Sequence, residues 1–156
     1  CLIPRTLTAA SGLSIRALLG RVMLVVDTSV LVYASGVEHP LREPAIRLFR
    51  DVAEKRIEAT TTPEVLQEYA HVRGRRDDRA RAVRQAERFA GLLAPLTIVS
   101  GDDVLQGLRM WSEVPGLCAF DAVLGSVAST RGWPVVSSDR GFSKAPSIEW
   151  IDLADY

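Results

Sequence analysis

The stretch Met23-Leu24-Val25-Val26-Asp27-Thr28-Ser29 decides the fold of this 156-residue chain. Its four leading apolar residues form a short continuous run, which is typical of a strand buried on both faces of a parallel sheet. The Asp-Thr-Ser sequence that follows supplies helix-capping side chains, and residues 30–33 can continue as a short helix. A buried strand that passes directly into a capped helix predicts an α/β fold, with Asp27 just outside the carboxyl end of the strand.

The rest of the sequence alternates between helical and strand-like patterns. Helical periodicity or capping signals predict helices at residues 42–55, from Pro63 onward, at 77–93, at 102–111 and at 120–130. Short apolar runs predict strands at residues 57–60, 96–99, 134–137 and 148–151. Thr62 is expected to cap the helix that begins at Pro63, and Asp102 or Asp103 the helix that ends near residue 111. Strands that alternate with helices predict a three-layer α/β/α domain with a mainly parallel central sheet.

Length and composition indicate one globular domain. Apolar residues make up 47% of the chain and charged residues 24%, which excludes a disordered protein. Residues 1–22 contain Arg5, Arg16 and Arg21 but no acid, and they resemble no element that the rest of the fold needs. We expect this segment to be an N-terminal extension outside a domain of residues 23–156. A transit peptide, or a lipidated terminus at Cys1, is the alternative.

The cysteines indicate the cellular compartment, whereas the net charge indicates no partner. Cys1 and Cys118 form neither a metal-binding spacing nor a disulfide framework, which fits a reducing cytoplasm. Cys118 lies among apolar neighbours and is expected to be a small buried residue. No run approaches the roughly 18 apolar residues of a membrane span. The net charge of zero says nothing about a nucleic-acid partner.

Three aspartates occupy positions where ligands collect in parallel α/β sheets. Asp27 follows the first strand, Asp139 follows the strand at residues 134–137, and Asp121 opens a helix of small residues. Helix capping or a solvated loop would explain each of them alone. Together they would converge on one pocket, where carboxylates repel one another unless a cation neutralises them. The sequence therefore predicts a site for a hard divalent metal.

Two acids in the helix that follows Thr62 compete for a place near this cluster. With about 100° per residue, Val65, Tyr69 and Val72 define the buried stripe of that helix. Glu68 borders the stripe at about 60° from Val65, whereas Glu64 lies about 100° from it. The helix dipole favours an acid in the first turn, which already explains the presence of Glu64 there. Glu68 is therefore the better candidate for an interior site.

The order of these acids resembles the PIN-domain family. The most specific pieces are Val-Val-Asp-Thr-Ser around Asp27 and Ser-Ser-Asp-Arg-Gly-Phe around Asp139, and the resemblance covers residues 23–156. It implies one set of catalytic acids, and these are Asp27, Glu68, Asp121 and Asp139. It also implies that Ser29 and Ser137 are the hydroxyl residues that hydrogen-bond the acids.

The family's chemistry fits what Mg²⁺ requires. Mg²⁺ takes oxygen ligands, keeps several waters and is usually held by one or two carboxylates. Asp27 and Asp139 are the first choice for direct ligands, with Asp121 as a further metal-binding acid. Glu68 or Asp121 would complete the site or position the water that attacks the phosphodiester. One metal ion and two remain equally compatible with the sequence.

Size and arginine-rich composition are most similar to the toxins of bacterial VapBC-type toxin–antitoxin pairs. This resemblance implies a cytoplasmic, Mg²⁺-dependent endoribonuclease toxin of a type II pair, in which Mn²⁺ can substitute. The partners it implies are an RNA substrate, a cognate antitoxin and a second copy of the chain. A PIN-type RNA-processing nuclease without an antitoxin, or a catalytically silent α/β binding module, is the alternative. In the family, the helix that carries the third acid often has a polar or aromatic residue three or four positions further on. Leu124 and Gly125 stand at those positions in this sequence.

An arginine-rich segment is the remaining candidate for function. Residues 73–88 contain seven arginines against Asp77, Asp78 and Glu87. They are either a solvated helix face, with internal pairs such as Asp77 with Arg81, or a rim that contacts RNA phosphates. The candidate RNA-binding residues are Arg73, Arg75, Arg76 and Arg79.

Overall fold

The computed structural model describes residues 22–76 and 78–156. The strands are β1 (Met23–Val26), β2 (Glu58–Thr60), β3 (Val135–Ser137) and β4 (Trp150–Asp152). The helices are α2 (Thr28–Ser35), α3 (Arg42–Ala53), α4 (Pro63–Arg76), α5 (Arg79–Leu92), α6 (Gly101–Glu113) and α7 (Ala119–Arg131), with 3-10 helices η1 (Arg140–Lys144) and η2 (Leu153–Asp155). Apart from Val22, the predicted extension at residues 1–22 lies outside the described residues, as does the predicted pair of Asp77 with Arg81.

The sheet is parallel throughout, in the order β2-β1-β3-β4. Strand β1 lies inside it, where Val25 pairs with Thr60 of β2 and with Val135 of β3. These three residues are almost completely buried. A parallel sheet with both faces covered needs such uninterrupted apolar strands, which explains the apolar run that begins at Met23.

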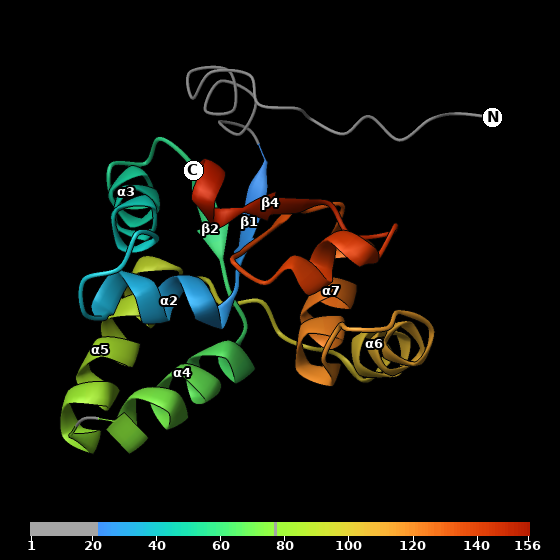
Figure 1. Cartoon of the computed structure of the whole chain (residues 1–156), viewed down its shortest axis with the longest axis horizontal. Coiled ribbons are helices and arrows are strands. Elements are labelled where there is room, and N and C mark those ends of the chain that lie inside the picture. Colours follow the sequence, from blue (N-terminus) through green and yellow to red (C-terminus); the bar gives the residue numbers. More distant parts are fainter. Residues whose placement is uncertain (1–21, 77) are drawn as a thin grey trace.

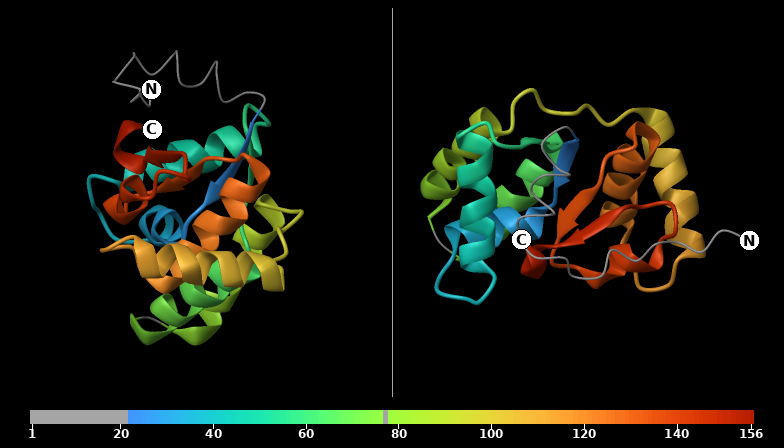
Figure 2. Two further views of the ribbon diagram at one scale, coloured as in Figure 1. Left: turned by 90° about the vertical axis from the view of Figure 1, so that its right-hand side faces the viewer. Right: turned by 90° about the horizontal axis from the view of Figure 1, so that it is seen from above.

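Helices cover both faces of the sheet, as the sequence predicts. Helices α2 to α5 lie on one side and α6 and α7 on the other (Figures 1 and 2). The apolar side of each layer meets in one core that includes Leu24, Val26 and Leu31, all fully buried. The three-layer α/β/α architecture is confirmed. Within the described part of the chain, no helix has both the length and the apolar character needed to cross a membrane.

The predicted strand at residues 96–99 is wrong. This segment passes the end of β2 without forming a ladder: the amide of Thr97 donates to the carbonyl of Thr61 at 2.9 Å, and the contact of Thr60 with Thr97 is between side chains. One backbone bond places the segment beside the sheet but does not extend the sheet. Leu96 and Val99 are half-buried and Ile98 is exposed, so the apolar run does not reflect a buried strand.

Two helix starts also differ from expectation. Ser100, and neither Asp102 nor Asp103, caps α6, while Asp103 returns a bond to the Ser100 amide in a capping box. The prediction that Cys118 is buried is wrong as well, since it is an exposed residue that caps α7 through its sulfur. Its sulfur accepts a hydrogen bond from the amide of Asp121 at 3.4 Å, so the apolar neighbours of Cys118 in the sequence did not indicate its environment.

Candidate active site

Asp27 is the centre of a hydrogen-bond network at the carboxyl end of β1. It is only 5% exposed, and it caps α2 by accepting from the amide of Ser29 at 3.2 Å. The same oxygen, Oδ2, accepts from the hydroxyls of Ser29 and Ser137, each at 2.7 Å. From the sequence, helix capping and a position in the site are alternatives for Asp27. In the structure the same side chain caps α2 and lies at the candidate site.

The two serines tie the end of β1 to the end of β3. The amide of Ser138 donates to Ser29 Oγ at 3.2 Å, and the amide of Asp139 donates to Ser137 Oγ at 2.9 Å. Among the described residues, none donates a hydrogen bond to the second oxygen of Asp27, Oδ1. The network thus fixes the Asp27 carboxylate through one oxygen and leaves the other available to a ligand.

Glu68 reaches the same region from α4. Its Oε2 accepts a hydrogen bond of 2.6 Å from the hydroxyl of Thr28, at the start of α2. The sequence indicates only a capping role for Thr28, so sequence reasoning missed this contact with Glu68. Glu64 also borders the cavity described below, but no hydrogen bond from the described residues fixes its side chain.

Asp121, in the first turn of α7, shows that the four acids are close enough to interact. Burial is the largest cause that raises its pKa, which lies near 6 instead of the ordinary 3.8. A hydrogen bond with Cys118 acts in the opposite direction. The negative charges of Asp27, Asp139 and Glu68 each raise the pKa of Asp121 further. The fold therefore brings together acids that are separated by as many as 112 positions.

A cavity of about 230 Å³ lies where these elements meet. Four acids line it, and they are Asp27, Glu64, Glu68 and Asp121. Its other lining residues are Thr62, Val65, Val99, Val104, Phe120, Val123 and Leu124. Asp139 does not line this cavity; its Oδ1 accepts from the amide of Gly141 at 2.7 Å and caps η1. No lysine, arginine or histidine of the described residues lines the cavity, so its negative charge has no internal counterion.

The donor set fits a hydrated divalent cation. All the charged groups that line the cavity are carboxylates, which are the oxygen ligands that Mg²⁺ prefers. In the described part of the chain, no three Asp, Glu, His or Cys side chains converge tightly enough to enclose a metal ion. Mg²⁺ does not need such a cage, because it keeps several waters and is held by one or two carboxylates. The residues present therefore suit a cation bound partly through water.

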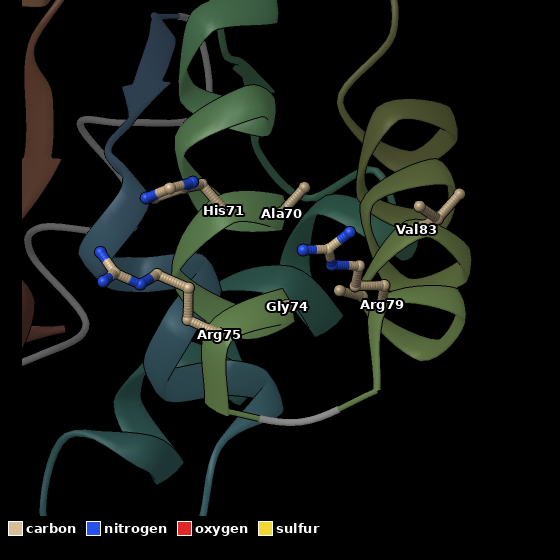
Figure 3. Close-up of a pocket in the computed structure, with 7 residues that line it drawn as sticks. Ala70, His71, Gly74, Arg75, Arg79 and Val83 are labelled. Atoms are coloured by element: carbon tan, nitrogen blue, oxygen red, sulfur yellow. The ribbon is translucent and has the colours of Figure 1, made fainter.

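The four candidate RNA-binding arginines have different environments. Arg73 is buried and donates to the carbonyl of Ser35 at 3.3 Å, so it joins α4 to α2. Arg75, Arg76 and Arg79 are exposed. Arg75 and Arg79 line a second cavity of about 640 Å³ between α4 and α5 (Figure 3). The structure thus separates Arg73, which packs in the interior, from the three arginines that can reach a ligand.

Comparison with protein families and with curated proteins gives consistent matches. Residues 24–148 match the PIN domain family. The chain is 43% identical over 131 residues to Ribonuclease VapC7 of Mycobacterium tuberculosis (strain ATCC 25618 / H37Rv), a match that covers 81% of this chain and 88% of the relative. It is 30% identical over 112 residues to Ribonuclease VapC23 of the same species, covering 70% of this chain and 86% of that relative.

Solved structures share the fold at low sequence identity. A DNA-bound VapBC structure from Salmonella typhimurium matches with a TM-score of 0.66 and 17% identity, over 85% of this chain and 98% of that chain. VapBC2 from Rickettsia felis, bound to a promoter DNA fragment, matches with a TM-score of 0.65 and 13% identity, over 83% and 97% of the two chains. These likenesses support the architecture alone. The similarity in sequence rests on the curated relatives.

Proposed function

This chain belongs to the PIN-domain family, and we propose that it is a divalent-metal-dependent endoribonuclease that acts as the toxin of a type II toxin–antitoxin pair. The observation that carries the proposal is the cavity lined by four carboxylates and by no basic side chain of the described residues. Carboxylates that lie close together repel one another, and a bound cation would relieve that repulsion. The curated relatives are ribonucleases, which supports RNA as the substrate.

Mg²⁺ is the cofactor that we propose, with Mn²⁺ as a substitute. Asp27, Asp121 and Asp139 would hold it, and the second oxygen of Asp27 has no competing hydrogen bond from the described residues. When bound, the metal lowers the pKa of a water and stabilises negative charge on the phosphate. The raised pKa of Asp121, about 6, reflects burial and the neighbouring carboxylates, and a bound cation would relieve the repulsion that contributes to it.

The protein's own groups orient the reactants. Ser29 and Ser137 hold Asp27 in one rotamer through its Oδ2, which spares the site the cost of ordering that carboxylate during the reaction. Thr28 does the same for Glu68. We propose that Glu68 accepts a hydrogen bond from the attacking water and so aims it at the phosphorus atom.

The surroundings of the cavity suit a single-stranded substrate. Phe120 borders the cavity and is 74% exposed, so its ring is free to stack on a base. We propose that Arg75, Arg76 and Arg79 contact RNA phosphates, and we leave Arg73 out because its side chain is buried. Leu124 lines the cavity, so α7 contributes an apolar wall there instead of a polar contact to the substrate.

We propose three further properties. The chain is cytoplasmic, a cognate antitoxin restrains it, and it forms a homodimer; the solved structures that share the fold are VapBC assemblies. Helix α6 exposes Leu105, Leu108 and Trp111 by 41 to 56%, an apolar face that a second copy would cover. We also propose that residues 23–156 form the nuclease domain and that residues 1–22 lie outside it. The experiment that tests the function is cleavage of total RNA by the purified chain with and without a divalent metal.

A further inference from the structure

The face of α4 that carries Glu68 continues beyond the carboxylate cavity. At about 100° per residue, Glu64, Glu68, His71 and Arg75 lie within about 60° of one another around the helix. The two acids line the carboxylate cavity, and His71 and Arg75 line the second cavity, between α4 and α5. Figure 3 shows His71 and Arg75 on the same side of α4. One helix face thus joins the two cavities, with acids at one end and bases at the other.

The second cavity is built where α5 approaches α4. The two helices are in contact range at Gly74, where a Cβ would lie at an ordinary van der Waals distance of 3.5 Å from Cγ of Arg79. Arg79, the first residue of α5, packs against α4 and lines the cavity with its side chain between the two helices, whereas the side chain of Arg75, which also lines the cavity, extends away from α5 (Figure 3). Ala70 and Val83 supply apolar surface beside these bases.

The bases of this cavity are not paired with any acid in the described part of the chain. Among residues 22–76 and 78–156, none forms a hydrogen bond or an ion pair with the side chain of His71, Arg75 or Arg79. Asp78, the adjacent acid, uses both carboxylate oxygens to cap α5 through the amides of Ala80 and Arg81. The donors that line the cavity are therefore available to an anion.

We infer that the cavity between α4 and α5 binds a backbone phosphate of the RNA strand, at a fixed distance from the bond that is cleaved. This inference rests on the proposed ribonuclease function. Seven residues of helix separate Glu68 from Arg75, a rise of about 10.5 Å. A stacked strand rises about 3.4 Å per nucleotide, so the bound phosphate lies within about three nucleotides of the scissile one. Arg75 and Arg79 contact it, and His71 contributes a ring N–H or a surface for stacking.

A salt titration with matched variants tests the phosphate contact. We would measure binding of a fluorescein-labelled oligouridylate of about sixteen nucleotides in EDTA, and compare wild type with Arg75→Gln/Arg79→Gln. The control is Arg84→Gln/Arg88→Gln, which removes the same charge from exposed positions of α5 outside the cavity. We expect the first pair to reduce the slope of log Kd against log salt by about 0.7, since both arginines contact one phosphate and one single-strand phosphate contact contributes about 0.7. The control pair should change that slope by less than half as much.

Three outcomes would overturn the inference, and they differ in meaning. Equal slopes for both double variants would show that the cavity is no special phosphate site, and would leave the ribonuclease proposal intact if wild type cleaves RNA. A wild-type protein that neither binds the oligonucleotide nor cleaves total RNA would overturn both proposals. Loss of binding to a co-expressed antitoxin, without loss of RNA binding, would instead assign the cavity to that protein.

Neutral phosphates test the fixed distance. Once a cleavage site is mapped, substrates with a single methylphosphonate at each of the neighbouring positions can be compared. In wild type, one substitution within about three nucleotides of the cleaved bond should lower kcat/KM more than the others. In Arg75→Gln/Arg79→Gln that position should lose its distinct effect. A flat profile in wild type would contradict a fixed subsite.

Discussion

Ser137, the last residue of β3, donates a hydrogen bond of 2.7 Å to Oδ2 of Asp27, which follows β1 and lies 110 positions earlier in the chain. Ser29 donates to the same oxygen at the same distance. Because these two bonds occupy Oδ2, they determine which oxygen of Asp27 is left for a cation. The neutral hydroxyls therefore fix the orientation of the Asp27 carboxylate.

Ser137→Ala should therefore impair RNA cleavage although it removes no charge. Loss of a residue that orients a metal ligand typically costs 10- to 100-fold in activity or metal affinity, and we expect an effect of about that size. Stability should fall by about 1–2 kcal/mol, because the amide of Asp139 loses its acceptor and Asp27 loses a donor. The control is Ser138→Ala, whose hydroxyl makes no hydrogen bond with the described residues. Equal activity of the two variants would show that the Ser137 hydroxyl does not matter to the site.

Glu68→Gln should reduce cleavage far more than Glu64→Gln. Both carboxylates line the cavity, but the contact with Thr28 fixes only that of Glu68, and Glu68 contributes to the raised pKa of Asp121. We expect a loss on the order of 100-fold or more in kcat for Glu68→Gln and less than about tenfold for Glu64→Gln. Thr28→Val, which frees Glu68 without altering its charge, should lie between them. A larger loss for Glu64→Gln would exchange the roles of the two acids.

The sequence could predict those parts of the site that depend on helical periodicity or on the common edge of a parallel sheet. The carboxyl ends of parallel strands lie at one edge, so the sequence placed Asp27 and Asp139 at the same edge, and the strand order of the structure makes their strands neighbours. The helical periodicity that separated Glu68 from Glu64 depends on the buried stripe of α4, where Val65 and Tyr69 are indeed buried. Site roles for these acids stay predictions until variants are measured.

The parts that were missed depend on contacts between distant elements. The bond from Thr28 to Glu68 needs α2 to pack beside α4, across 40 residues, and no local pattern reports that packing. Arg73 belongs to the same arginine-rich segment as its neighbours, and the sequence does not distinguish it from them. It is nevertheless buried, because its side chain points toward α2. The apolar run at residues 96–99 looks like a strand but makes only one backbone bond beside β2, from Thr97 to Thr61.

Asp103 should make stability depend on pH at acid values. Its burial would raise its pKa, but bonds from Arg131 and Ser100 outweigh that and lower the pKa from 3.8 to about 2. A group whose pKa is depressed by folding stabilises the protein above its unfolded value, near 4, and loses that contribution as pH falls toward 2. Asp103→Asn should cost about 1–2 kcal/mol at neutral pH, by thermal or urea unfolding. The difference from wild type should shrink between pH 4 and 2.

Asp102→Asn is the matched control for Asp103. Asp102 is the adjacent acid in the same first turn of α6, but it is exposed and makes no hydrogen bond with the described residues. Its substitution should change stability by less than about 0.5 kcal/mol. If Asp102→Asn and Asp103→Asn destabilise equally, the effect is that of the helix field and not of the bonds to Arg131 and Ser100.

Expression of the chain alone should arrest bacterial growth if it is a restrained toxin. An antitoxin arginine that reaches the carboxylate cavity would compete with Mg²⁺ for the same oxygens, so co-expression of the neighbouring small gene should restore growth and yield a complex that survives purification. Asp27→Asn should remove the arrest without the partner. Harmless expression of the wild-type chain, together with RNA cleavage in vitro, would favour an RNA-processing nuclease instead.

The most direct test of the central claim is cleavage of total RNA by purified wild type and Asp27→Asn, with Mg²⁺, with Mn²⁺ and with EDTA. An asparagine at position 27 keeps one oxygen to accept from Ser29 and Ser137, so the fold should remain while the charge that binds metal is lost. The account predicts cleavage by wild type with either metal, none in EDTA, and at least about a thousandfold less by Asp27→Asn at an unchanged melting temperature. Cleavage that persists in EDTA, or that Asp27→Asn performs at the wild-type rate, would contradict it.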